Sequence, residues 1–179
     1  MFAPLARLRT RIQAAGRAHW YVRWGVDLVW ITVFVAAVSA WQTRSHVRGD
    51  APAFSAPTLD GGQVTLTSLR GRPVMLAFWA PWCVVCKQEA PNIEWTRDLV
   101  GDRARVLTVA SAYRDTREVQ RYVDDRAMAS PVILGGDDVA ARFRVEQYPT
   151  VYFLDEEGRI KNSVVGYTTT VGLLWRLWW

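Results

Sequence analysis

The sequence predicts an α/β sandwich around a mixed sheet, preceded by one transmembrane helix. Strand and helix patterns alternate from residue 54 onward, which is typical of helices packed against a central sheet. Before them, residues 24–41 form an apolar segment with a single charge, Asp27. Of the 179 residues, 50% are apolar and 22% are charged. This is the composition of a globular protein, which excludes disordered and low-complexity classes.

The apolar segment Trp24–Trp41 is long enough to cross a bilayer. As a helix with a rise of about 1.5 Å per residue it covers roughly 27 Å, close to the hydrocarbon core of about 30 Å. Tryptophans stand at both ends, where rings favour the membrane interface. Because five arginines precede the segment, we expect a single-pass protein of the inner membrane. Its N-terminus would stay in the cytoplasm and its following domain would lie in the periplasm.

Two other interpretations of this segment stay open. Val38 and Ala40 satisfy the small-residue rule for signal-peptide cleavage before Trp41, although the 23 residues before the segment are long for such a signal. The segment could also be a buried helix of a cytosolic protein, although nothing before it would cover its apolar surface.

The charge of the chain is divided unevenly. Residues 1–50 hold seven Arg and two Asp, a net charge of +5, whereas residues 51–179 hold 15 basic and 15 acidic residues. A neutral domain has no clustered basic surface for nucleic acid, so we expect no such partner. The chain divides into four parts: a basic cytoplasmic segment (1–23), the anchor (24–41), a polar linker (42–52) and one α/β domain (53–179).

The elements of the domain follow from hydrophobic periodicity and turn residues. Residues 73–80 are apolar without a break, as in a strand buried on both faces. Asp115 and Glu118 have the spacing of a capping box at a helix start. The last helix is expected to pack on the sheet, and contact with a membrane surface is the alternative. In all, the sequence predicts a hairpin over 54–66, strands over 73–80, 105–113, 131–136, 150–155 and 161–167, and helices over 83–99, 115–126, 137–145 and 168–179.

The two cysteines, Cys83 and Cys86, predict redox chemistry. A disulfide between them would close too short a loop to stabilise the fold much. They lie where a buried strand ends and a helix begins, and the free N–H groups of a helix start favour thiolate over thiol. We expect Cys83 to attack and Cys86 to resolve the mixed disulfide. Glu89, three residues after Cys86, either exchanges that cysteine's proton or is a solvated acid on the outer face.

Two motifs carry a family resemblance. The segment WAPWCVVCK over 79–87, followed by Pro91, resembles the active-site segment of the thioredoxin superfamily, and Tyr148-Pro149-Thr150 resembles its cis-proline loop. The CKQEAP of residues 86–91, the hairpin and the anchor are similar to the TlpA/ResA-like membrane-anchored thiol–disulfide oxidoreductases. Residues 166–179, together with the anchor, most resemble the ScsD-type protein disulfide oxidoreductases.

The resemblance implies a thioredoxin-like fold with a mixed sheet flanked by helices and an N-terminal β-hairpin. It implies catalysis by Cys83 and Cys86, a proton-exchanging Glu89, and a substrate surface of Trp82, Tyr148 and a cis Pro149. Protein disulfides would be the substrates and a membrane protein of the DsbD/ScsB type the electron donor. No metal and no cofactor beyond the redox-active disulfide is expected.

The sequence also departs from relatives of this kind. Ala77 stands where thioredoxins have a buried acid, and Val84-Val85 between the cysteines has no polar side chain to stabilise a thiolate. Two other functions stay open: a Cu(I)-binding module that uses the two thiolates, and an inert domain with an unused dithiol. Both histidines, His19 and His46, lie outside the predicted domain, which disfavours the copper function.

Overall fold

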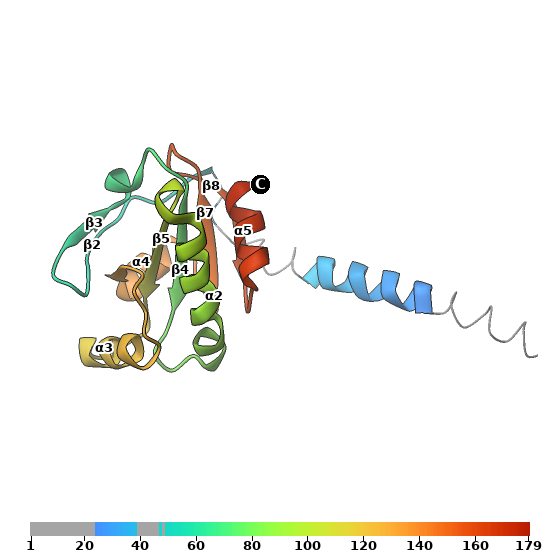
Figure 1. Ribbon diagram of the computed structural model, residues 1–179, viewed down its shortest axis with the longest axis horizontal. Helices are drawn as coiled ribbons and strands as arrows, with labels where there is room; N and C mark the ends of the chain where they lie inside the picture. Colours follow the sequence, from blue (N-terminus) through green and yellow to red (C-terminus); the bar gives the residue numbers. More distant parts are fainter. Residues whose placement is uncertain (1–23, 39–46, 48) are drawn as a thin grey trace, which may run out of the picture. The chain divides into compact units, whose positions relative to one another are not determined.

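The structure, a computed structural model, describes residues 24–38, 47 and 49–179 and has two compact units, within residues 1–42 and 43–179 (Figure 1). The described part of the first unit is a helix over 24–38 with exposed side chains. No helix among the described residues is long and apolar enough to cross a membrane, so the predicted spanning helix is not found there. Three predicted parts lie outside the described residues: the basic segment, the end of the anchor (39–41) and most of the linker.

Six strands form the central sheet of the second unit, in the order β1-β8-β7-β4-β5-β6. Its parallel half consists of β4 (Val74–Trp79), β5 (Arg105–Ala110) and β6 (Val132–Leu134). The other half is antiparallel and consists of β7 (Thr150–Leu154), β8 (Arg159–Val165) and β1 (Gly49–Asp50). In it β7 pairs with β4, β8 pairs with β7, and β1 pairs with β8. The predicted mixed sheet is confirmed, and β4 is buried along its whole length as its apolar run predicts.

Helices cover both faces of this sheet. On one face lie α2 (Val84–Val100), α3 (Thr116–Asp125) and α5 (Thr170–Trp178), with α2 and α5 side by side in Figure 1. On the other lie α4 (Gly136–Arg142), the 3-10 turn η1 (Leu66–Leu69) and the hairpin of β2 (Ser55–Pro57) and β3 (Gln63–Thr65). Alternate residues of β4 face the two layers: Leu76 and Phe78 pack with α4 and the hairpin, whereas Met75 and Ala77 pack with α2 and α5.

Several strands differ from the predicted ranges: β4, β6 and β8 are shifted or shortened by one or two residues at their ends, β1 is an additional strand, and β5 is shorter than predicted. Gly49 and Asp50 of the predicted linker form β1, because their backbone pairs with Ile160 and Arg159 at the edge of the sheet. The strand predicted over 105–113 ends at Ala110. Ala112 has a φ of 49°, in the left-handed region, and this conformation turns the chain out of the sheet.

The start of α3 corrects a second prediction. Asp115 caps the helix, but its carboxylate accepts from the Arg117 N–H at 2.8 Å and from the Arg117 guanidinium at 2.6 Å. The side chain of Glu118 accepts instead from the Arg114 N–H at 3.3 Å. The predicted capping box is therefore wrong in both halves: Asp115 accepts from the N–H of Arg117 rather than from that of Glu118, and Glu118 accepts from the N–H of Arg114 rather than from that of Asp115.

Candidate active site

Both cysteines lie at the junction of β4 and α2, and their sulfurs form a disulfide with an S–S distance of 2.10 Å. Cys83 is the N-cap of α2, and the Cys86 N–H donates to Cys83 Sγ at 3.1 Å. This N–H is one of the donors that a helix start leaves without a backbone acceptor. Aimed at Cys83 Sγ, it would stabilise negative charge on that sulfur after reduction.

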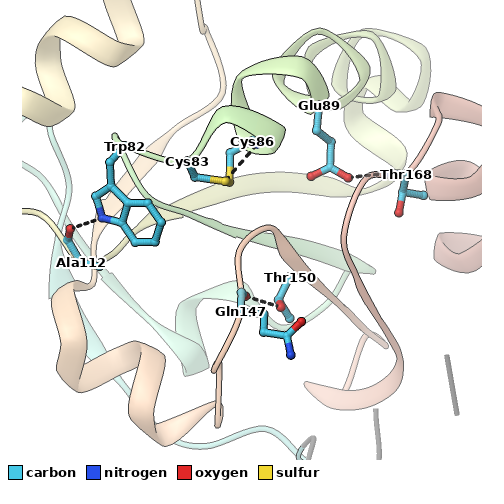
Figure 2. The surroundings of a disulfide bond; sticks show 8 residues. All are labelled: Trp82, Cys83, Cys86, Glu89, Ala112, Gln147, Thr150 and Thr168. Atoms are coloured by element: carbon cyan, nitrogen blue, oxygen red, sulfur yellow. Dashed lines mark hydrogen bonds between the residues drawn. A yellow bond between two sulfur atoms is a disulfide. The ribbon is translucent and has the colours of Figure 1, made fainter. Parts of the chain in front are cut away.

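Exposed apolar side chains beside the two buried cysteines form an apolar rim. Trp82 is 64% exposed, and Val84 and Val85 are also exposed. The indole N–H of Trp82 donates to the Ala112 carbonyl at 3.0 Å, which fixes the ring (Figure 2). The ring edge meets Tyr148 with 5.9 Å between centroids. Trp82 and Tyr148 therefore form an aromatic pair beside the nucleophile, and their role as a contact surface for substrates stays a prediction.

The loop before β7 carries the predicted proline. The peptide bond between Tyr148 and Pro149 is cis, as predicted. The Thr150 hydroxyl donates to the Gln147 carbonyl at 2.8 Å and closes the loop, which faces the disulfide in Figure 2. Tyr148 packs against the core cluster that contains both cysteines. Residues about sixty positions apart in the chain thus meet at one site.

Glu89 is fully buried, so the interpretation of it as a solvated acid is wrong. One carboxylate oxygen accepts from the Thr168 N–H at 2.8 Å, and the other has no hydrogen-bond partner. Burial raises the pKa of Glu89 to about 7, against a smaller lowering by the Thr168 N–H. Its spacing from Cys86 places it on the same side of α2, and Figure 2 shows its carboxyl group between the disulfide and Thr168 in that view.

Asn92 and Thr168 hold Glu89 in place, and both were missed from the sequence. The Asn92 amide donates to the Thr168 carbonyl and to the Tyr167 hydroxyl, each at 3.0 Å, and its oxygen accepts from the Thr170 hydroxyl at 3.3 Å. Asn92 lies three residues after Glu89 on the buried side of α2. The spacing of two polar residues on one side of the helix was the signal in the sequence that could have identified this pair. It does not show the partners of Asn92, which come from the far end of the chain.

These features define a class of protein: a thioredoxin-like domain with a Cys-x-x-Cys disulfide at the start of a helix and a cis proline beside it. The chain belongs to the AhpC/TSA family, whose profile matches residues 47–163. Two kinds of known protein illustrate what it resembles.

Among curated proteins, the chain is 36% identical over 121 residues to the thioredoxin-like protein YneN of Bacillus subtilis (strain 168). This match covers 66% of this chain and 71% of YneN. It is 26% identical over 155 residues to the thiol-disulfide oxidoreductase ResA of the same strain. This match covers 83% of this chain and 86% of ResA. The predicted ResA-like relationship is thereby confirmed, and the ScsD-type subgroup stays a prediction.

Among solved structures, DsbF of Mycobacterium tuberculosis, in mixed oxidised and reduced forms, superposes with a TM-score of 0.64. It is 32% identical in sequence, and the match covers 69% of this chain and 92% of DsbF. The predicted thioredoxin-like fold is confirmed. Regarding the copper function, the described residues contain no group of three or more His, Cys, Asp and Glu that could hold a metal ion.

Proposed function

We propose that this protein is a membrane-tethered periplasmic thiol–disulfide oxidoreductase that reduces or exchanges protein disulfides. The observation that carries the proposal is the Cys83–Cys86 disulfide at the N-terminus of α2, with the Cys86 N–H on Cys83 Sγ and a buried carboxyl group one helical turn beyond. The names of ResA and of YneN support it. The chemistry needs no cofactor other than the dithiol itself.

In the reducing direction, the Cys83 thiolate attacks one sulfur of a substrate disulfide. The other substrate sulfur leaves as a thiolate and takes a proton from solvent, so a mixed disulfide joins Cys83 to the substrate. Cys86 then loses its proton and attacks Cys83 Sγ. The second substrate thiol is released and the Cys83–Cys86 bond closes, so that two electrons have passed from the dithiol to the substrate.

Glu89 is suited to take the Cys86 proton in the second step. An acid–base group acts best with a pKa near the operating pH, and burial places that of Glu89 at about 7. Its oxygen without a partner is free to accept a proton, while the other oxygen stays bound to Thr168. In Glu89→Gln we expect the pH dependence of substrate release from Cys83 to flatten around neutral pH. An unchanged pH profile would remove the proton role and leave the two cysteine roles standing.

The substrate surface consists of the apolar rim and the proline loop. Trp82 and Tyr148 offer aromatic area for side chains around the target disulfide. The Tyr148 backbone is the proposed partner of an extended substrate chain, since the Pro149 carbonyl already accepts from the Gly166 N–H. Each reducing turnover leaves the enzyme oxidised, so a donor must return two electrons. A membrane protein of the DsbD/ScsB type is the proposed donor, on the resemblance to tethered relatives.

The proposed location rests on the sequence pattern of residues 24–41 and on the five arginines before it. Fractionation of cells that produce the full chain tests it. Recovery with the inner membrane and digestion of the domain by protease added to spheroplasts are expected. Recovery in the cytosol would overturn the tether and the export.

Turnover is tested with the domain alone, since its core clusters lie within residues 47–179. The reduced domain should reduce a peptide disulfide, Cys83→Ser should abolish this, and Trp175→Ser, on the outside of α5, should leave it unchanged. The direction follows from the reduction potential: a value near about −270 mV favours reduction and one near about −120 mV favours oxidation. Absence of exchange with any peptide disulfide would overturn the proposed activity.

A further inference from the structure

Exposed apolar side chains recur on two adjoining helices that cover the same face of the sheet, along the C-terminal half of α2 and along α5, whereas the disulfide lies at the N-terminus of α2. Apart from Trp82, Val84 and Val85 beside the disulfide and Tyr167, every large apolar residue exposed in the described part of residues 47–179 belongs to this face. Their exposed fractions run from 41% to 77%. We call this set the tryptophan face; it consists of Trp95, Leu99, Val171, Trp175, Trp178 and Trp179.

Helical spacing and the contacts between α2 and α5 place these side chains on neighbouring helices. Asn92 on α2 is bonded to the start of α5, and Trp95 and Leu99 follow it by three and seven residues, on the same side of the helix. On α5, Val171, Trp175 and Trp178 recur every three or four residues, opposite the buried Leu173 and Leu177. Trp175 and Trp179 stack at 5.5 Å, and the Arg103 guanidinium after α2 lies 5.8 Å from the Trp178 ring.

The chemistry of the tryptophan face fits the surface of a phospholipid bilayer. Trp is the residue most suited to the boundary between headgroups and acyl chains, and cations beside it suit anionic headgroups. Residues 166–179 contain no Asp or Glu and one Arg, Arg176. Of the nearby acids, Glu94 and Asp98 share Arg97, and Asp102 pairs with Arg72. Arg103 beside Trp178 brings the number of arginines here to three, equal to the number of these acids.

The course of the chain points to the same occupant. Seven residues, 42–48, separate the proposed tether 24–41 from β1, and a chain of seven residues spans at most about 25 Å. β1 pairs with β8, and α5 packs on β7 and β8, so the chain enters the domain at the sheet edge that α5 covers. If the proposed tether holds residues 24–41 in a bilayer, the linker limits the distance between that bilayer and β1, the strand at the sheet edge that α5 covers.

We infer that the tryptophan face is a lipid-docking surface, through which the domain rests on the bilayer that anchors it. The inference takes its membrane from the proposed tether but concerns different residues. Docking on α2 and α5 leaves the rim around Trp82 free, so a substrate can be bound while the domain is at the membrane. Docking also limits the orientations in which the disulfide meets a membrane-embedded electron donor.

Binding of residues 47–179 to vesicles of phosphatidylethanolamine and phosphatidylglycerol tests the inference. Sedimentation with the vesicles and a blue shift of tryptophan emission are expected. Trp175→Ser should lower the partition coefficient roughly tenfold, because a large apolar side chain no longer leaves water. Trp82→Ser is the matched control: the two tryptophans are 63% and 64% exposed, and only Trp175 belongs to the tryptophan face. The control should bind vesicles like the wild type.

Three results would overturn the inference. The domain could fail to bind vesicles, or both substitutions could weaken binding equally. The domain could also form a dimer that Trp175→Ser abolishes, without any vesicle binding, in which case a second copy covers the face. Peptide-disulfide reduction in the same samples, and cell fractionation of the full chain, report separately on the proposed activity and on the tether.

Discussion

Replacement of the buried Glu89 by glutamine should make the stability of the oxidised domain less dependent on pH. A glutamine side chain keeps the shape of a protonated glutamic acid and can still accept from Thr168, but it cannot ionise. Folding raises the pKa of the wild-type carboxyl from 4.5 to about 7. The folded state therefore binds this proton more tightly than the unfolded chain, and the free energy of unfolding falls as the pH rises from about 4.5 to about 7. At about 1.4 kcal/mol per pKa unit, the ionised form is roughly 3 kcal/mol less stable.

The measurement is urea denaturation of wild type and Glu89→Gln from pH 5 to pH 8, with the disulfide intact. The difference between the two proteins isolates Glu89, since other titrating groups are common to both. We expect the variant's advantage to grow with pH and to level off above about pH 7 at no more than roughly 3 kcal/mol. Glu157→Gln, at an exposed position, should follow the wild type at every pH. Parallel curves for wild type and Glu89→Gln would refute the burial argument.

Three further substitutions test other parts of the structure. Asn92→Ala removes the amide that holds the Thr168 segment, so we expect the free energy of unfolding to fall by about 1–3 kcal/mol in a denaturation experiment. We also expect a higher pH midpoint for substrate release, because Thr168 in turn binds Glu89. A purely structural loss would leave this midpoint unchanged. Phe143→Ala removes a buried ring that meets three other aromatic rings; it should cost about 3–5 kcal/mol of stability yet leave disulfide reduction intact below its melting temperature. Cys86→Ser should accumulate the mixed disulfide on Cys83, visible by non-reducing electrophoresis, and rapid release of substrate from this variant would contradict the resolving role.

The core of the fold and the centre of the site were predictable because their signals are local. An unbroken apolar run identifies β4 as a strand buried on both faces. The position of the cysteine pair between that strand and a helix predicts that an N–H of the helix start lies at Cys83, and the Cys86 N–H does so. Pro149 was assigned from a resemblance to known proteins, and nothing in the local pattern distinguishes it from other prolines.

What the sequence determined by itself was therefore the order of strands and helices and the redox pair, since periodicity and helix ends depend on near neighbours. Tertiary structure decided that Glu89 is buried, because Thr168, 79 residues later, closes over it. It also paired Gly49 with Ile160 as an added edge strand. It left the tryptophans of α5 outside the core, because Leu173 and Leu177 already fill the space against the sheet. Burial is a property of what covers a residue, and the covering segments here lie far away in the chain.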